Sequence, residues 1–136
     1  MILYGSSLFL KHIDNIIKRN KYPRKDFLRL IKDCVNEIND NPTTNQPTDT
    51  FSQTKCGFWK RRFGIPFDNR GKSFGLRFIY RVQEHINTIR FVVLYDKKFD
   101  DDIVYKVLKQ IKASIKNNTI QWYLLEEYFG EELKEI

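Results

Sequence analysis

Basic side chains recur at alternate positions along two short segments that read as neighbouring β-strands. Successive side chains of a strand point to opposite sides of its sheet. One sheet face therefore collects the positive residues of both segments, namely Lys60, Arg62, Arg77 and Arg81. Four more positive residues fall in the flanking loops, at Arg70, Lys72, Lys97 and Lys98.

Counterions for these positive charges are nearly absent from the surrounding sequence. Asp68, in the loop between the two strands, is the sole carboxylate of residues 56–82. Like charges held close together repel and destabilise a fold, which tolerates them most readily where an anion binds. We therefore expect this face to be exposed and to bind an anion. The alternative is a solvated sheet face with scattered ion pairs.

The charge of the whole chain favours the same kind of partner. The sequence has 24 Lys and Arg against 17 Asp and Glu, a formal charge of +7. Residues 118–136 hold five glutamates and one lysine, so the positive excess belongs to the rest of the chain. A basic body favours a polyanion, because each phosphate that it neutralises releases counterions.

Length and composition exclude several classes of protein. The 136 residues suit one domain over residues 1–136, and a hydrophobic content of 41% is too high for a disordered chain. No apolar run is long enough to span a membrane, and the first ten residues lack the basic start of a secretory signal. Cys34 and Cys56 have neither metal-ligand spacing nor a disulfide framework, so we expect a cytoplasmic protein without metal or cofactor.

The first half of the chain predicts a short strand over residues 2–4 followed by two helices. Ser6 or Ser7 is placed to cap the first helix, and Pro23 suits the first turn of the second, which Asn41-Pro42 ends. Both helices carry apolar residues at three- and four-residue intervals, so they form an antiparallel hairpin with one apolar face. Residues 42–55 are polar and aperiodic, which predicts a surface loop.

The second half predicts three consecutive strands, over residues 58–63, 76–82 and 88–95, and then two helices. The last helix is expected over residues 120–133, with a break at Gly130, inside a C-terminal extension of residues 118–136. The resulting order is β-α-α-β-β-β-α-α. It indicates an α+β fold in which the helix hairpin packs on a small antiparallel sheet. Four residues form the expected core face of the middle strand: Leu76, Phe78, Tyr80 and Val82.

Four motifs in this order resemble the RelE/HigB-like toxins of bacterial type II toxin–antitoxin pairs. They are Trp59-Lys60-Arg61-Arg62, Gly71-Lys72-Ser73-Phe74-Gly75, Arg77-Phe78-Ile79-Tyr80-Arg81 and Tyr95-Asp96-Lys97-Lys98. The resemblance covers about residues 56–115 and implies a RelE-like fold. This sequence departs from the family in having Phe74 for a second loop glycine, Arg81 for a tyrosine, and the C-terminal extension.

The resemblance implies a metal-independent endoribonuclease that cuts mRNA on the ribosome by attack of the 2′-OH on the adjacent phosphate. It implies Lys60 as base, Arg62 and Arg77 as clamps on the transition state, and Lys98 or Tyr105 as acid or base-stacking partner. The flanking positive side chains are expected to bind RNA, at Arg70, Lys72, Arg81 and Lys97. Replacing Arg77 with Ala is expected to abolish toxicity while leaving the fold intact.

Other functions are compatible with the same resemblance. One is a ParE-like toxin that inhibits DNA gyrase as a protein binder, and another is a catalytically inactive relative that binds nucleic acid or protein. The implied partners are a cognate acidic antitoxin and mRNA on the ribosome, within a homodimer or a toxin–antitoxin hetero-oligomer. The C-terminal aromatic residues suit a core or a dimer surface. In a second interpretation the glutamate-rich segment folds over the basic sheet and mimics the antitoxin.

Overall fold

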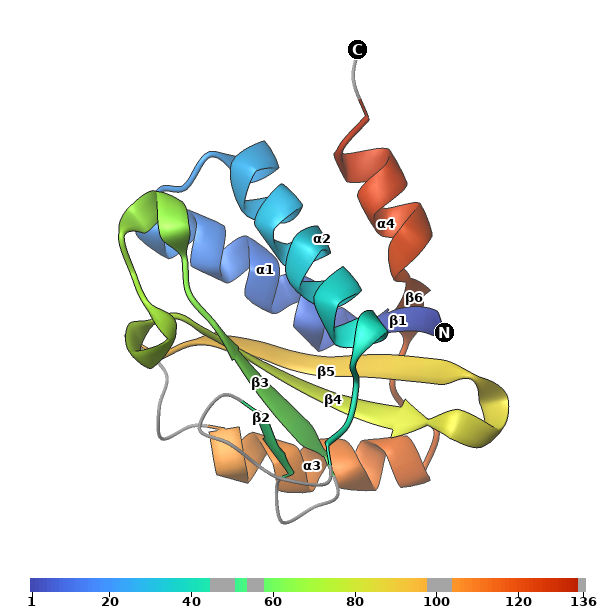
Figure 1. The fold of residues 1–136 in the computed structure, drawn as a ribbon. Helices are drawn as coiled ribbons and strands as arrows, with labels where there is room; N and C mark the ends of the chain where they lie inside the picture. The colour runs from blue at the N-terminus through green and yellow to red at the C-terminus, as the bar shows by residue number, and fades with distance from the viewer. Residues whose placement is uncertain (45–50, 54–57, 98–103, 135–136) are drawn as a thin grey trace.

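The computed structural model describes residues 1–44, 51–53, 58–97 and 104–134 (Figure 1). Its helices and strands are β1 (Ile2–Ser6), α1 (Ser7–Asn20), α2 (Arg24–Asp40), β2 (Phe51–Gln53), β3 (Trp59–Phe63), β4 (Leu76–Gln83), β5 (Thr88–Asp96), α3 (Val104–Lys116), β6 (Trp122–Leu124) and α4 (Leu125–Glu132). The predicted α+β class, with a pair of N-terminal helices packed on a small sheet, is confirmed.

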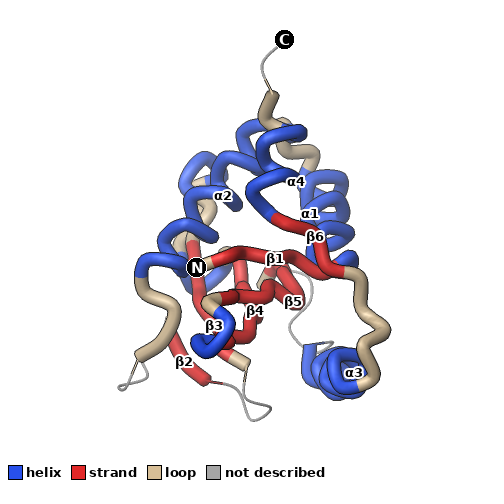
Figure 2. Tube along the Cα trace, turned by 90° about the vertical axis from the view of Figure 1, so that its right-hand side faces the viewer, coloured by secondary structure: helices blue, strands red, loops and turns tan. Residues whose placement is uncertain are grey.

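The strands form one six-stranded sheet in the order β2-β3-β4-β5-β1-β6. Strands β3, β4 and β5 make the predicted antiparallel meander, whereas β1 pairs with β5 in parallel. The sheet is therefore mixed, and the expectation of a purely antiparallel sheet is wrong. Helices α1, α2 and α4 lie on one side of the sheet and α3 lies on the other (Figures 1 and 2).

Local signals position the first two helices as predicted. The Ser6 hydroxyl accepts a hydrogen bond from the Phe9 backbone N–H at 2.9 Å, which caps α1, and donates to the Val92 carbonyl at 2.7 Å. Helix α2 begins at Arg24, one residue after Pro23, and ends at Asp40. Their apolar stripes are buried against the sheet: Phe9, Ile13, Ile16, Phe27, Ile31, Cys34, Val35 and Ile38.

The predicted core face of β4 is confirmed. Leu76, Phe78 and Tyr80 are fully buried under α1 and α2, together with Phe63 of β3. Arg61 points toward this same side, where a charge has no place in the core, so its guanidinium reaches the edge. There it lies 3.7 Å from the Glu37 carboxylate and donates to the Asn41 carbonyl at 3.1 Å.

The opposite face of the sheet carries a second, smaller core beneath α3. Its buried members are Phe58, Ile79, Val92, Val93, Tyr95 and Ile111. Strand β5 has a β-bulge here: Ile79 pairs with Val93 and Tyr80 pairs with Phe91, so Val92 has no partner in the register. Val92 and Val93 therefore both belong to this cluster. The expectation that this face is openly exposed is wrong for its centre, which α3 covers (Figure 2).

Two further elements differ from the sequence-based expectation. The stretch expected to be a polar loop, residues 42–55, contains β2, which pairs with β3 at one edge of the sheet. The stretch expected to be helical from residue 120 begins with β6, which pairs with β1 at the other edge. Gly130 does not break the last helix but lies within α4.

Helix α4 packs on the side of the sheet opposite to α3. Leu125 and Phe129 join the main core, and Glu132 lies 3.1 Å from Arg24 of α2. The glutamate-rich segment therefore does not fold over the basic residues of β3 and β4, and this interpretation is wrong for its described part. Among the helices that the structure describes, none is long and apolar enough to cross a membrane.

Candidate anion-binding site

Lys60 and Arg62 of β3, Arg77 of β4 and Lys97 after β5 form a group that we call the cationic cluster. Arg62 lies directly opposite Arg77 in the strand register, and Lys60 shares their face two residues away. Burial lowers the pKa of Lys60, and the charges of Arg62, Arg77 and Lys97 lower it further. The predicted convergence of Lys60, Arg62 and Arg77 on one place is therefore observed.

Arg77 is buried in this cluster, with 1% of its surface exposed. Its Nη1 donates to the Lys72 carbonyl at 2.7 Å and the Leu76 carbonyl at 3.2 Å, and its Nη2 donates to the Ser73 carbonyl at 3.1 Å. Burial and the neighbouring Arg62 lower its pKa. The expectation that Arg77 is exposed is wrong. Because its guanidinium holds the loop before β4, we now expect its loss to destabilise the fold.

The loop before β4 packs tightly against the end of β3. A Cβ atom on Gly75 would lie 2.0 Å from the Phe63 carbonyl oxygen, which is far inside van der Waals contact, whereas a Cβ on Gly71 would meet nothing within 4 Å. The Lys97 backbone N–H donates to the Gly75 carbonyl at 3.0 Å. The loop is thus held between the end of β3 and the end of β5, which places residues 72–75 beside the cationic cluster.

Arg70 is not available for RNA in this structure, contrary to expectation. Its guanidinium forms an ion pair with Asp96, which is fully buried, and one Nη1···Oδ2 distance is 3.1 Å. Its Nε donates to the Phe74 carbonyl at 2.7 Å, and Asn20 of α1 donates to Asp96 at 3.2 Å. The hydrogen bond to Asp96 raises the pKa of Arg70. Arg70 therefore links α1, the loop and the end of β5.

Lys60 and Arg62 differ from Arg70 in having no acidic partner among the residues that the structure describes. Within that part of the chain, no carboxylate lies within ion-pair distance of either side chain. The buried Nε of Arg62 likewise has no hydrogen-bond acceptor there. A buried donor without an acceptor is costly, so the arrangement suits a site that an anion completes.

The other predicted residues lie apart from the cluster or outside the description. Lys72 is exposed in the loop, and Arg81 is exposed four residues beyond Arg77, about 13 Å along the strand. Arg81 lines a hollow of about 480 Å³ with Trp59, Gln83 and His85. Lys98 lies outside the described residues. Tyr105 lies in the first turn of α3, and its side chain is outside the description.

The sequence analysis missed one further basic residue on this face, Arg90. The Arg90 guanidinium of β5 lies 5.0 Å from the ring centre of Trp122 and 5.8 Å from that of Tyr4. Arg90 also lies opposite Arg81 in the register, so it lies toward the end of the face away from Arg62 and Arg77. Side-chain alternation along residues 88–95 could have placed Arg90 on this face. Its aromatic partners could not have been found in this way, because they come from β1 and β6, which are remote in sequence.

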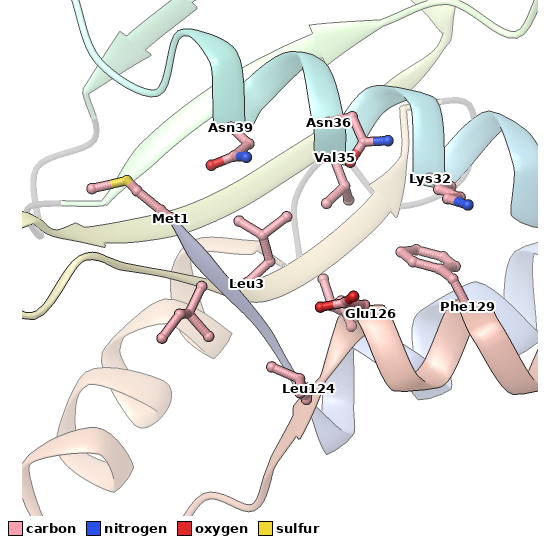
Figure 3. Close-up of a pocket in the computed structure, with 11 residues that line it drawn as sticks. Met1, Leu3, Lys32, Val35, Asn36, Asn39, Leu124, Glu126 and Phe129 are labelled. Carbon is pink, nitrogen blue, oxygen red and sulfur yellow. The ribbon is translucent and has the colours of Figure 1, made fainter.

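A separate pocket of about 310 Å³ lies on the other side of the sheet, between α2, the start of β1 and α4 (Figure 3). Its walls are largely apolar, with Val35, Leu124 and Phe129, and Lys32 and Asn39 at its margin. It contains none of the residues of the cationic cluster. Among the described residues no group of His, Cys, Asp or Glu could hold a metal ion.

A scan against protein-family models and a search of the curated proteins found no match to this chain. The family resemblance therefore rests on the motifs of residues 59–98.

Proposed function

We propose that this chain is a RelE/HigB-like toxin that cuts mRNA on the ribosome without a metal ion. The observation that carries the proposal is the position of Lys60. It is a lysine of lowered pKa beside two arginines, and none of the three has a carboxylate partner in the described residues. Such an arrangement supplies both a base and a positive field for a phosphate that gains charge in its transition state.

The mechanism follows from these roles. Neutral Lys60 accepts the proton of the ribose 2′-OH, and the oxygen attacks the adjacent phosphorus. Arg62 stabilises the added negative charge on the phosphate oxygens, while Arg77 holds the loop beside it through the carbonyls of Lys72 and Ser73. The P–O5′ bond breaks and the leaving oxygen takes a proton from an acid, for which the resemblance offers Lys98 or Tyr105. The products are a 2′,3′-cyclic phosphate and a free 5′-OH.

The proposal includes a setting and a partner. The chain would act in the cytoplasm, where ribosomes are, and an acidic antitoxin would neutralise it in a hetero-oligomer. The excess of basic residues supports such a partner, because an acidic protein covers a basic surface with complementary charge.

Ribosomes programmed with a defined mRNA test the proposal directly. We expect the purified protein to cut that mRNA, and Lys60→Ala to slow the cut about 100-fold or more, as loss of a general base does. Lys11→Ala is the matched control, because Lys11 is exposed on α1, on the other side of the sheet, and should cut at the wild-type rate. Intact mRNA with wild-type protein would refute the proposal, and inhibition of DNA gyrase instead would favour the ParE-like alternative.

A further inference from the structure

Phe74 exposes 66% of its surface, more than any other large hydrophobic residue of the described chain. Single exposed hydrophobic residues are common on proteins and by themselves indicate nothing. The surroundings of Phe74 are what distinguish it.

The backbone around Phe74 is fixed from both sides of the sheet. Its carbonyl accepts a hydrogen bond from Arg70 Nε at 2.7 Å, and Arg70 is itself held by the buried Asp96. The carbonyls of the two preceding residues accept from Arg77, and Gly75 lies against β3. The loop therefore has a defined shape that does not depend on packing of the Phe74 ring.

The contrast with Phe67, the other exposed aromatic residue of this region, is clear. The Phe67 ring packs edge-on against Tyr22 with the ring centres 5.0 Å apart, which accounts for its place in the fold. Within the described residues no ring packs on Phe74 in this way. An aromatic side chain is thus presented to solvent on a hydrogen-bonded loop, with no ring packed on it among the described residues.

Positive residues lie close to Phe74 along the chain and through backbone pairing. Lys72 lies two residues before it, Arg77 lies three residues after it, and the Lys97 backbone N–H donates to the Gly75 carbonyl at 3.0 Å. Proteins that bind single-stranded nucleic acid combine such cations, which hold phosphates, with exposed aromatic rings on which bases stack. Stacking tolerates any base, because every base has a π-face.

We propose that Phe74 is a stacking platform for an unpaired RNA base next to the phosphate that the cationic cluster binds. The inference rests on the proposed function for the choice of RNA as the polyanion. It adds a contact that distinguishes a nucleobase from a bare phosphate chain. The alternative, in which Phe74 inserts into a partner protein, predicts no dependence of RNA binding on this ring.

Two oligomers of equal charge separate these alternatives. One is a short single-stranded RNA in the 2′-O-methyl form, which cannot be cut because its attacking hydroxyl is blocked. The other is an abasic ribose-phosphate chain of the same length. We expect the wild-type protein to bind the RNA more tightly than the abasic chain. Phe74→Ala should weaken RNA binding about 5- to 150-fold, the range for loss of one stacked base, and leave abasic binding unchanged.

Two control variants complete the experiment. Phe74→Tyr keeps an aromatic ring and should retain the preference for RNA, and Phe67→Ala removes an exposed ring elsewhere and should retain it too. Equal binding of both oligomers by the wild type, no binding of either, or an equal loss on both with Phe74→Ala would overturn the inference. Base-dependent binding by a protein that leaves mRNA on ribosomes intact would refute the endonuclease and support the stacking. Cutting of mRNA by the wild type, together with an RNA affinity that Phe74→Ala does not change, would support the endonuclease and refute the stacking.

Discussion

Arg62 occupies the cationic cluster at a cost to the stability of the fold, so removing its charge should make the protein more stable. It lies directly opposite Arg77 on the neighbouring strand, and its buried Nε has no acceptor among the described residues. The substitution Arg62→Met keeps the aliphatic stem that packs on the sheet and removes the charge and the donors. We expect it to abolish cleavage of mRNA while stabilising the folded state.

The magnitude follows from these two features. A buried donor without an acceptor costs about 1–3 kcal/mol, and like charges directly opposite on paired strands cost about 0.2–1 kcal/mol. Allowing for water that reaches a half-buried side chain, Arg62→Met should raise the free energy of unfolding by about 1–2 kcal/mol. Arg77→Met should act in the opposite direction and lower it by about 2–4 kcal/mol, because three carbonyls lose a charged donor.

Urea denaturation followed by tryptophan fluorescence measures both changes, since Trp59 and Trp122 lie in the sheet. The same titration with tripolyphosphate present tests the site itself, because a ligand of the folded state stabilises it by mass action. Tripolyphosphate should stabilise the wild type more than Arg62→Met, whereas the control Arg29→Met, on the exposed side of α2, should behave as the wild type does. A loss of more than about 1 kcal/mol in Arg62→Met would refute the reasoning, since it would make Arg62 a structural residue.

Three other perturbations test the surroundings of the cluster. Gly75→Ala should destabilise the protein in urea by about 3 kcal/mol because its Cβ would overlap the Phe63 carbonyl, and Gly71→Ala should be neutral; equal effects would contradict the loop packing. The rate of mRNA cleavage should rise with pH and level off above the pKa of Lys60, because the base acts in its neutral form. Burial and the neighbouring cations hold this pKa below the usual 10.5. A Lys60→Arg variant with the same pH profile would exclude Lys60 as the base. Asp96→Ala should cost about 3–5 kcal/mol in thermal or urea unfolding, since it leaves the largely buried Arg70 side chain with only the exposed Asp68, 3.9 Å away, as a counterion. A loss below about 1 kcal/mol would show the pair to be dispensable.

Local patterns were sufficient for the elements that carry the cluster. The apolar stripes of α1 and α2 and the serine cap of α1 are signals within a few residues. Helix α1 therefore begins at its predicted cap, and α2 begins and ends within one residue of the prediction. Strand alternation placed Lys60, Arg62 and Arg77 on one face, because that rule depends only on backbone geometry. The same rule assigned Phe78 and Tyr80 to the core.

Short segments at the two edges of the sheet were assigned wrongly. Residues 122–124 have helical spacing when joined to the following residues, yet they form β6 because the free edge of β1 offers backbone partners there. Strand β2 arises in the same way beside β3. Pairing with a remote strand overrides a weak local preference in segments of three residues, which no local pattern can anticipate.

By itself the sequence determined that positive side chains gather on one sheet face, because alternation and a nearly complete lack of nearby carboxylates are properties of the chain order. Only the tertiary structure decided what each cation does. Arg70 was drawn into a pair with Asp96, which is 26 residues away, and Arg77 was buried beneath a loop whose carbonyls it holds. Lys60 and Arg62 were left without such partners among the described residues. The physical reason is that a buried charge requires compensation from whatever the fold brings to it, and those groups come from segments distant in sequence.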